Sequence, residues 1–386
     1  MTLPTREEEL HWLALVMVPG LGARTANRLL EQFRTPAAIF QASRSELESS
    51  GVAGGVAQSI TSGCAFDDAA AQHQKMAAAG ASLVPILDPR FPVRLKEIFD
   101  PPVVLFARGR LDLLGGLHLG VVGTRRPTPY GVAASERLSG DLARAGLTIV
   151  SGMARGVDTS AHRGALAAEG NTVAVLGCGV DLVYPAENRK LSEQITEKGL
   201  IVSEFPMGAP AYPQNFPIRN RIVSGMSLGV LVVEGAQYSG SSITARLAME
   251  QGREVFAIPG SIMSRMSWGP NLLIKQGAKL VQDFNDVVVE FSPEVRRQLA
   301  FESRGRLFAA GEETEAGPAA SNQVTSTNPA ARSVLNRLKI ETATHIDDLL
   351  TGIENLTSSE IIAALFELEM TGLIRQLPGK NFVKVW

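Results

Sequence analysis

The stretch LGVVGTRRPTPYGVAASERLSGDLARAGLTIVSG, residues 119–152, contains one complete strand–helix–strand unit. Its apolar runs, Leu119 to Val122 and Thr148 to Val150, do not alternate with polar residues, which is typical of strands covered on both faces of a parallel sheet. The segment between them, Gly131 to Ala145, has the pattern of a helix. Two parallel strands joined by a helix are the building unit of open α/β folds.

The same alternation continues to about residue 292. Further strands are expected at Thr172 to Leu176, Leu200 to Ser203, Val230 to Val233, Val255 to Ile258 and Lys279 to Val281. Further helices are expected at Thr159 to Glu169, Glu187 to Lys198 and Ser241 to Gln251. The pattern predicts an α/β fold with a Rossmann-like, doubly wound parallel sheet over residues 81–292.

Different patterns flank this region. Residues 1–80 predict short helices, and the turn Pro19-Gly20-Leu21-Gly22 between two of them resembles a helix-hairpin-helix or SAM-like module. Because acidic residues outnumber basic ones there, a packing role is favoured over a phosphate-binding hairpin. Residues 301–330 lack apolar periodicity and predict a flexible linker. Residues 331–386 predict three helices and a hairpin, which together suggest a winged helix.

Composition excludes several classes of protein. The 386 residues include 37 basic and 39 acidic side chains, so a basic coat for nucleic acid is excluded, although a local basic groove is not. Two distant cysteines without a CxxC pattern indicate neither a disulfide framework nor a zinc site. Acidic residues near the N-terminus and the absence of a long apolar run predict a soluble, cytoplasmic protein. No metal or cofactor is expected.

The loops that follow the strands contain small residues, arginines and aromatic residues. Because the carboxyl ends of parallel strands meet at one edge, these loops are expected to line one crevice. Helix N-termini at such an edge suit anions, and Arg125, Arg219 and Arg221 are expected to converge there and grip phosphate oxygens. Aromatic side chains able to stack on bases lie in the same loops: Tyr184, Phe216 and Tyr238.

Acidic and imidazole groups in these loops are also candidates for acid–base chemistry. Asp158 is well placed to cap the helix near Thr159, and His162 falls one turn later, so structural roles are favoured for both. Glu204 and Glu234 follow apolar strands and fit either a catalytic pair or ion pairs that hold the arginines. The second interpretation is favoured, and no catalytic residue is assigned.

Six strings, taken in order, resemble the DNA-processing protein A family, also called DprA or Smf. They are VVGTR (121–125), SGMARGVD (151–158), YPAEN (184–188), NFPIRNRIVSG (215–225), SGSSITA (239–245) and IPGS (258–261). The helical and winged-helix flanks also look like optional parts of that family. One departure is Met153, where many members have glycine.

The resemblance implies a protein that binds single-stranded DNA, protects incoming DNA in natural transformation, and helps to load RecA recombinase. It also implies a homodimer formed through the Rossmann domain. Family contacts are carried over to Gly123, Thr124 and Arg125 and to a basic residue after the third strand, for which Lys190 is preferred to Arg189. The complete set of expected DNA-binding residues is Gly123, Thr124, Arg125, Ser151, Gly152, Asn188, Lys190, Phe216, Arg219, Asn220, Arg221, Ser239, Gly240 and Ser241.

A nucleotide-binding or nucleotide-cleaving Rossmann enzyme is the alternative. The cleaving group carries a Pro-Gly-Gly-x-Gly-Thr-x-x-Glu loop, whereas residues 235–241 read GAQYSGS and lack the glutamate. Dinucleotide enzymes use GxGxxG after the first strand, where this chain has Gly-Thr-Arg. The last helix of the expected winged helix, Thr357 to Thr371, contains glutamates but no lysine or arginine, which favours a protein-interaction role over duplex binding.

Overall fold

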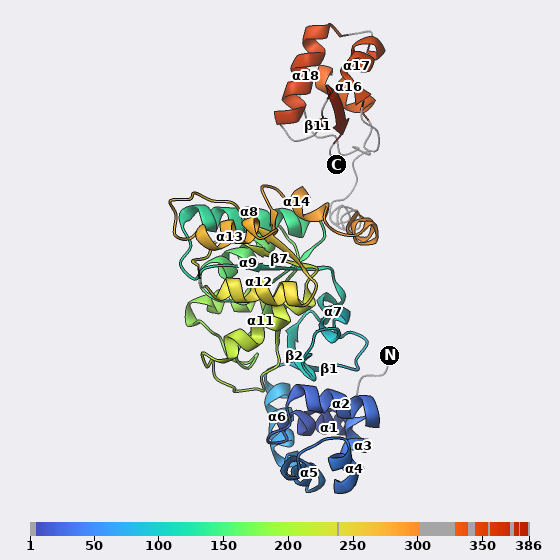
Figure 1. The fold of residues 1–386 in the computed structure, drawn as a ribbon, viewed down its shortest axis with the longest axis vertical. Coiled ribbons are helices and arrows are strands. Elements are labelled where there is room, and N and C mark those ends of the chain that lie inside the picture. The colour runs from blue at the N-terminus through green and yellow to red at the C-terminus, as the bar shows by residue number, and fades with distance from the viewer. Residues whose placement is uncertain are drawn as a thin grey trace, which may run out of the picture. The chain divides into compact units, whose positions relative to one another are not determined.

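A computed structural model of the chain describes residues 5–237, 239–300, 329–338, 344–353, 356–370, 374–377 and 379–384. Tyr238 and the expected linker up to residue 328 lie outside these residues. Contacts divide the chain into two compact units, Met1–Glu312 and Glu313–Trp386, whose elements are shown in Figure 1. The exact domain boundaries stay predictions. Within the described residues, no helix has the length and apolar character needed to cross a membrane.

A nine-stranded sheet organises the first unit, with the order β1-β2-β6-β5-β4-β3-β7-β8-β9. Neighbouring strands from β6 to β9 are parallel, whereas β2 runs antiparallel to β6, and β1 antiparallel to β2. The strands are β1 (Ser82–Pro85), β2 (Val104–Gly109), β3 (His118–Val122), β4 (Thr148–Ser151), β5 (Thr172–Val175), β6 (Leu200–Ser203), β7 (Gly229–Val232), β8 (Glu254–Ala257) and β9 (Lys279–Leu280). The seven predicted strands and the doubly wound sheet are confirmed; β1 and β2 were not predicted.

Helices cover both faces of this sheet. They are α7 (Val93–Lys96), α8 (Pro129–Arg144), α9 (Val157–Ala167), α10 (Arg189–Lys198), α11 (Asn215–Met226), α12 (Gly240–Glu250), α13 (Trp268–Lys275) and α14 (Asn285–Val288), with 3-10 turns at Leu111–Gly115 and Ala186–Asn188. Alternate residues of β3 serve the two layers, because Leu119 and Val121 join the core of α8 and α9 while Val122 joins that of α11 and α12. The four predicted helices are confirmed, whereas α11 was not predicted.

Six short helices precede the sheet: α1 (Arg6–Met17), α2 (Ala23–Phe33), α3 (Pro36–Gln41), α4 (Arg44–Ser49), α5 (Gly54–Thr61) and α6 (Phe66–Ala78). The predicted break between the first two is confirmed, and Gly20 occupies it with φ +79°, a conformation that favours glycine. The helices share one core with sheet residues such as Phe106 and Ala174. Two side-chain amides tie them further, since Asn27 Nδ2 donates to the Pro101 carbonyl (2.8 Å) and Gln72 Nε2 to that of Met207 (3.2 Å).

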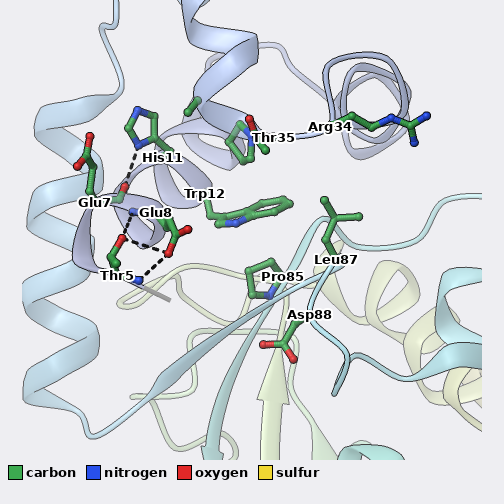
Figure 2. A pocket seen from close by; sticks show the side chains of 12 residues that line it. Thr5, Glu7, Glu8, His11, Trp12, Arg34, Thr35, Pro85, Leu87 and Asp88 are labelled. Carbon is green, nitrogen blue, oxygen red and sulfur yellow. Dashed lines mark hydrogen bonds between the residues drawn. The ribbon is translucent and has the colours of Figure 1, made fainter. Parts of the chain in front are cut away.

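A cavity of about 600 Å³ lies between these helices and the end of β1. Figure 2 shows the Trp12 indole reaching into it between Thr35 and Pro85. Its other lining residues include the acidic Glu7, Glu8 and Asp88 and the basic Arg34. Acidic residues therefore dominate its charge, which disfavours a phosphate ligand.

The described residues of the second unit form three helices and a small antiparallel sheet in the order β10-β12-β11. Its elements are α16 (Pro329–Arg337), β10 (Thr344–His345), α17 (Ile346–Gly352), α18 (Ser358–Met370), β11 (Ile374–Leu377) and β12 (Asn381–Lys384). A capping box precedes α18: the Thr357 amide donates to Glu360 Oε2 (2.8 Å), and the Glu360 amide donates to Thr357 Oγ1 (3.4 Å). The predicted winged helix is confirmed.

Candidate nucleic-acid interface

The strand order reverses between β3 and β7, which places a crevice outside their carboxyl ends. The loops after these two strands are fastened together, because the Thr124 amide donates to the Glu234 carbonyl (2.7 Å). The Glu234 side chain is 2% exposed and accepts from the amide (2.8 Å) and the hydroxyl (2.6 Å) of Thr128. A Cβ on Gly131 would stand 2.2 Å from Glu234 Oε2. Glu234 therefore binds the N-terminus of α8. The favoured interpretation, in which Glu234 holds an arginine by an ion pair, is wrong.

One stack of side chains, called here the mouth of the crevice, stands at the carboxyl edge between the loop after β3 and the loop after β5. The exposed Arg125 places its guanidinium carbon 5.3 Å from the centroid of the Phe216 ring. The Phe216 and Tyr184 rings lie 5.5 Å apart at 32°, and Tyr184 is 41% exposed. Gly177 makes room for them, since a Cβ there would lie 3.0 Å from the Phe216 ring. A cation and two aromatic rings are thus presented together at the edge where ligands bind.

The loop after β4 uses its polar groups internally. Ser151 is fully buried, and its hydroxyl donates to the Val121 carbonyl (2.6 Å). The amides of Gly152 and Ala154 donate to the Asp158 carboxylate at 3.1 and 3.2 Å. Burial raises the pKa of Asp158, and the Arg219 charge and these two bonds oppose that shift. Ser151 and Gly152 were expected to offer free groups to a ligand, but Ser151 Oγ and the Gly152 amide hold the loop instead.

Arg219 lies beneath this loop rather than in the crevice. It is 4% exposed, and its Nη1 donates to the Val175 carbonyl at the end of β5 (2.6 Å). A Cβ on Gly152 would stand 1.8 Å from the same Nη1, so only glycine fits above the guanidinium. Burial lowers the pKa of Arg219, and the nearby Arg125 charge adds to that effect. The two arginines do approach each other, but the expected open grip by Arg219 is wrong, because the sheet end already occupies it.

Arg221 is also enclosed. Its guanidinium makes a bidentate ion pair with Glu204 (2.7 and 2.6 Å) and a further bond to Asp100 (3.0 Å). Burial opposes its charge, but the two carboxylates outweigh burial and raise the pKa of Arg221. The expectation that Arg221 opens to phosphate is wrong, whereas the interpretation that Glu204 holds an arginine is confirmed. Asn220, between the two arginines, is half-buried.

The expected DNA-binding residues at the start of α10 differ in their exposure. Asn188 is 5% exposed, and its Nδ2 donates to the Met153 carbonyl and to Thr159 Oγ1, both at 2.9 Å. The next two residues, Arg189 and Lys190, are exposed. Asn188 thus ties α10 to the β4 loop, while the two cations after it face solvent.

The N-terminus of α12 lies at the same edge. The Ser239 hydroxyl lies 2.7 Å from that of Ser241, and a Cβ on Gly235 would stand 2.6 Å from Ser241 Oγ. Gly240 is exposed, and a Cβ there would meet open space. An 11-residue helix therefore begins at an open glycine, an arrangement that suits an anion.

Several groups with acid–base or nucleophilic potential in the α/β region are buried. His162 is fully buried, Nδ1 lies 2.7 Å from Thr172 Oγ1, and burial lowers the pKa of the ring to about 3. Burial raises the pKa of the Cys178 thiol to about 11. The predicted structural role of His162 is confirmed. Asp158 is structural too, but the expectation that it caps the helix is wrong, because Gly156 is the N-cap of α9 and the Asp158 carboxylate closes its own loop. Over the described ranges, no cluster of three or more potential metal ligands occurs.

Sequence periodicity contained a signal that was missed. Asn215, Arg219, Ile222 and Met226 follow helical spacing and form the buried face of α11. Recognising that helix would have placed Arg219 against the sheet. The clamp between Glu234 and Thr128 had no comparable signal, because it joins loops 106 residues apart.

Family comparisons agree with this architecture. A family model described as DNA recombination-mediator protein A matches residues 82–292, more than half of the chain. The chain belongs to the DNA recombination-mediator protein A family. A second model, described as the DprA winged helix domain, matches residues 317–380. The family expected from the sequence is confirmed.

Relatives in several bacteria support the assignment. The chain is 44% identical over 212 residues to DNA processing protein DprA of Bacillus subtilis, covering 55% of this chain and 71% of that protein. The DprA structure from Streptococcus pneumoniae matches with TM-score 0.65 and 36% identity over 76% of this chain and 99% of that one. The Helicobacter pylori DprA structure, described for its unique single-stranded DNA binding mode, matches with TM-score 0.50 and 31% identity over 57% and 96% of the two chains.

Proposed function

We propose that this protein binds single-stranded DNA along the carboxyl edge of its sheet, in DNA uptake and recombination. The observation that carries the proposal is the stack of Arg125, Phe216 and Tyr184 at the mouth of the crevice. Aromatic rings stack on unpaired bases of any sequence, and a guanidinium beside them binds phosphate. Support also comes from the relative in Helicobacter pylori, whose structure is described for single-stranded DNA binding.

The expected DNA-binding residues fall into two groups with different roles. Those at the open edge contact the strand: Gly123, Thr124, Arg125, Lys190, Phe216, Ser239 and Gly240. Those behind it hold the loops that present these contacts: Ser151, Gly152, Asn188, Arg219, Asn220, Arg221 and Ser241, which is 4% exposed. The division follows exposure and existing bonds, since Arg219 and Arg221 already have protein partners.

Binding without turnover fits the site better than catalysis. The alternative, a nucleotide-binding or nucleotide-cleaving enzyme, needs a free acid or base, whereas Glu234 holds Thr128 and the His162 ring is buried and neutral. Protection of incoming strands, loading of RecA recombinase in the cytoplasm, and homodimer formation through the Rossmann domain complete the proposal. These steps rest on the family resemblance.

The test is a competition between single-stranded and duplex DNA for the full chain across a range of salt. If three to five phosphates are neutralised, log K against log salt has a slope of roughly -2 to -3.5, from about -0.7 per phosphate. Single strands should win at every salt concentration. Equal or tighter binding of blunt duplex would refute the proposed function.

A further inference from the structure

A second pocket opens at the same edge of the sheet. Its cavity of about 390 Å³ is in the lower part of the range of small-ligand sites, about 300–1,000 Å³. One wall follows the carboxyl ends of β8 and β9, and the other is a stripe of α8. The lining residues are Tyr130, Ala133, Ala134, Arg137, Leu138, Ile258, Pro259, Val281 and Gln282.

Tyr130 is fixed within this pocket. Its hydroxyl donates to the Pro259 carbonyl (2.9 Å), and the side chain is 51% exposed. Burial raises the pKa of Tyr130, and the Glu234 charge acts in the same direction, so the hydroxyl keeps the proton it donates. The anchored hydroxyl limits ring rotation while half of the side chain remains open to solvent.

The rest of the lining matches a flat ligand with a charged attachment. Ala133 and Ala134 leave space along α8, and Leu138, Ile258 and Val281 give an apolar floor. Arg137, 76% exposed, stands on the same helix two turns after Tyr130, and its guanidinium lies 3.8 Å from Asp141. An aromatic wall, an apolar floor and a guanidinium at the mouth are the groups that hold a nucleobase and its phosphate.

We infer that this pocket takes one base of the bound single strand, with the base stacked on Tyr130 and the adjoining phosphate held by Arg137. The inference deepens the proposed function and rests on it. The chain path supports it, because α8 starts directly after the Arg125 loop and Thr128 is fastened to Glu234 beside β7. A strand that leaves Arg125 along the carboxyl edge therefore meets the start of α8 next.

The test compares variants of the full chain on oligothymidine and on the same backbone made abasic throughout. Tyr130→Leu keeps apolar bulk but removes the ring, and should weaken binding of oligothymidine about tenfold, or about 1.4 kcal/mol. On the abasic strand it should bind as wild type does. Tyr130→Phe keeps the ring and should stay within about twofold of wild type. Neither change should alter the salt slope, because no phosphate contact is lost.

Arginine variants provide the charge control. Arg137→Ala should reduce the magnitude of the salt slope by about 0.7, whereas Arg144→Ala, an exposed arginine further along α8, should change nothing. If Tyr130→Leu equals wild type on oligothymidine while Arg125→Ala is impaired, the pocket inference is refuted and the proposed function stands. Equal losses on both strands refute it too, as does a loss of dimer mass in light scattering that accounts for the weaker binding. If wild type does not bind single strands, the function and the inference both fail.

Discussion

The mouth of the crevice and the helix behind it both contain arginines, in opposite surroundings. Arg125 is exposed on the loop between β3 and α8 and lies over the Phe216 ring. Arg219 and Arg221, on α11, are 4% and 7% exposed and bond to a carbonyl and to carboxylates. Residue type and location at a sheet edge therefore do not identify a ligand contact. What distinguishes the two regions is whether the fold encloses the arginine side chain.

The largest expected effect is a loss of stability when the buried ion pair between Arg221 and Glu204 is broken. Arg221→Met leaves the Glu204 carboxylate enclosed without its partner, so we expect the free energy of unfolding to fall by about 3–5 kcal/mol. Urea unfolding followed by circular dichroism measures this change. The double variant Arg221→Met with Glu204→Leu should recover much of the loss.

A matched ion pair at the surface sharpens that result. Arg155 pairs with Glu187, but their side chains are 55% and 61% exposed. Arg155→Ala should therefore leave the free energy of unfolding nearly unchanged, because solvent screens an exposed pair. If the Arg221→Met protein were stable but no longer bound single strands, Arg221 would be a DNA contact. The distinction between the exposed Arg125 and the buried arginines on α11 would then not hold.

At the mouth of the crevice, a substitution should reduce DNA affinity rather than stability. Arg125→Ala should weaken single-strand binding by roughly 1.5–3 kcal/mol, because one charge-assisted contact is removed. The melting temperature should stay within experimental error, since the side chain is exposed. Arg163→Ala, an exposed arginine on α9, is the control and should bind as wild type does. Fluorescence anisotropy with labelled oligothymidine measures both.

Acid should destabilise the folded protein through His162. Its pKa of about 3 lies below the unfolded value of 6.5, so the unfolded chain binds a proton that the folded chain does not. Stability from this group is complete above pH 6.5 and is lost as pH falls towards 3. Between pH 7 and 5 the contribution is about 2 kcal/mol. His162→Asn should lose that part of the pH dependence in urea unfolding; an unchanged pH profile would contradict the buried, neutral ring.

The strands were predictable because both of their faces are covered, which leaves continuous apolar runs such as Leu200–Ser203. The pair β1 and β2 was not predictable, because it follows no helical crossover and lies at an edge of the sheet. The loops that form the candidate site were also predictable from the sequence, because the topology of a parallel sheet brings them to one edge. The burial of each side chain was not predictable: only the packing of Gly152 on Arg219 and of Glu204 on Arg221 shows which arginines are enclosed.

The smallest expected effect comes from removing the winged helix. The wing contains Lys380 and Lys384, but α18 has no basic residue, so the unit is expected to interact with proteins rather than duplex DNA. A chain ending after Ala300 retains Leu299, which packs in the α/β core. Its single-strand affinity should stay within about threefold of the full chain, under roughly 0.7 kcal/mol. Micromolar or tighter sequence-specific duplex binding by residues 331–386 would contradict this assignment.

The central claim is that the exposed cation at the crevice mouth, and not the buried pair on α11, neutralises phosphate. The direct measurement is the salt slope of oligothymidine binding for wild type, Arg125→Ala and the double variant Arg221→Met with Glu204→Leu. The slope should become shallower by about 0.7 for Arg125→Ala and remain at the wild-type value for the double variant. An unchanged slope for Arg125→Ala, together with a shallower slope for the double variant, would place the DNA on α11 and contradict the account.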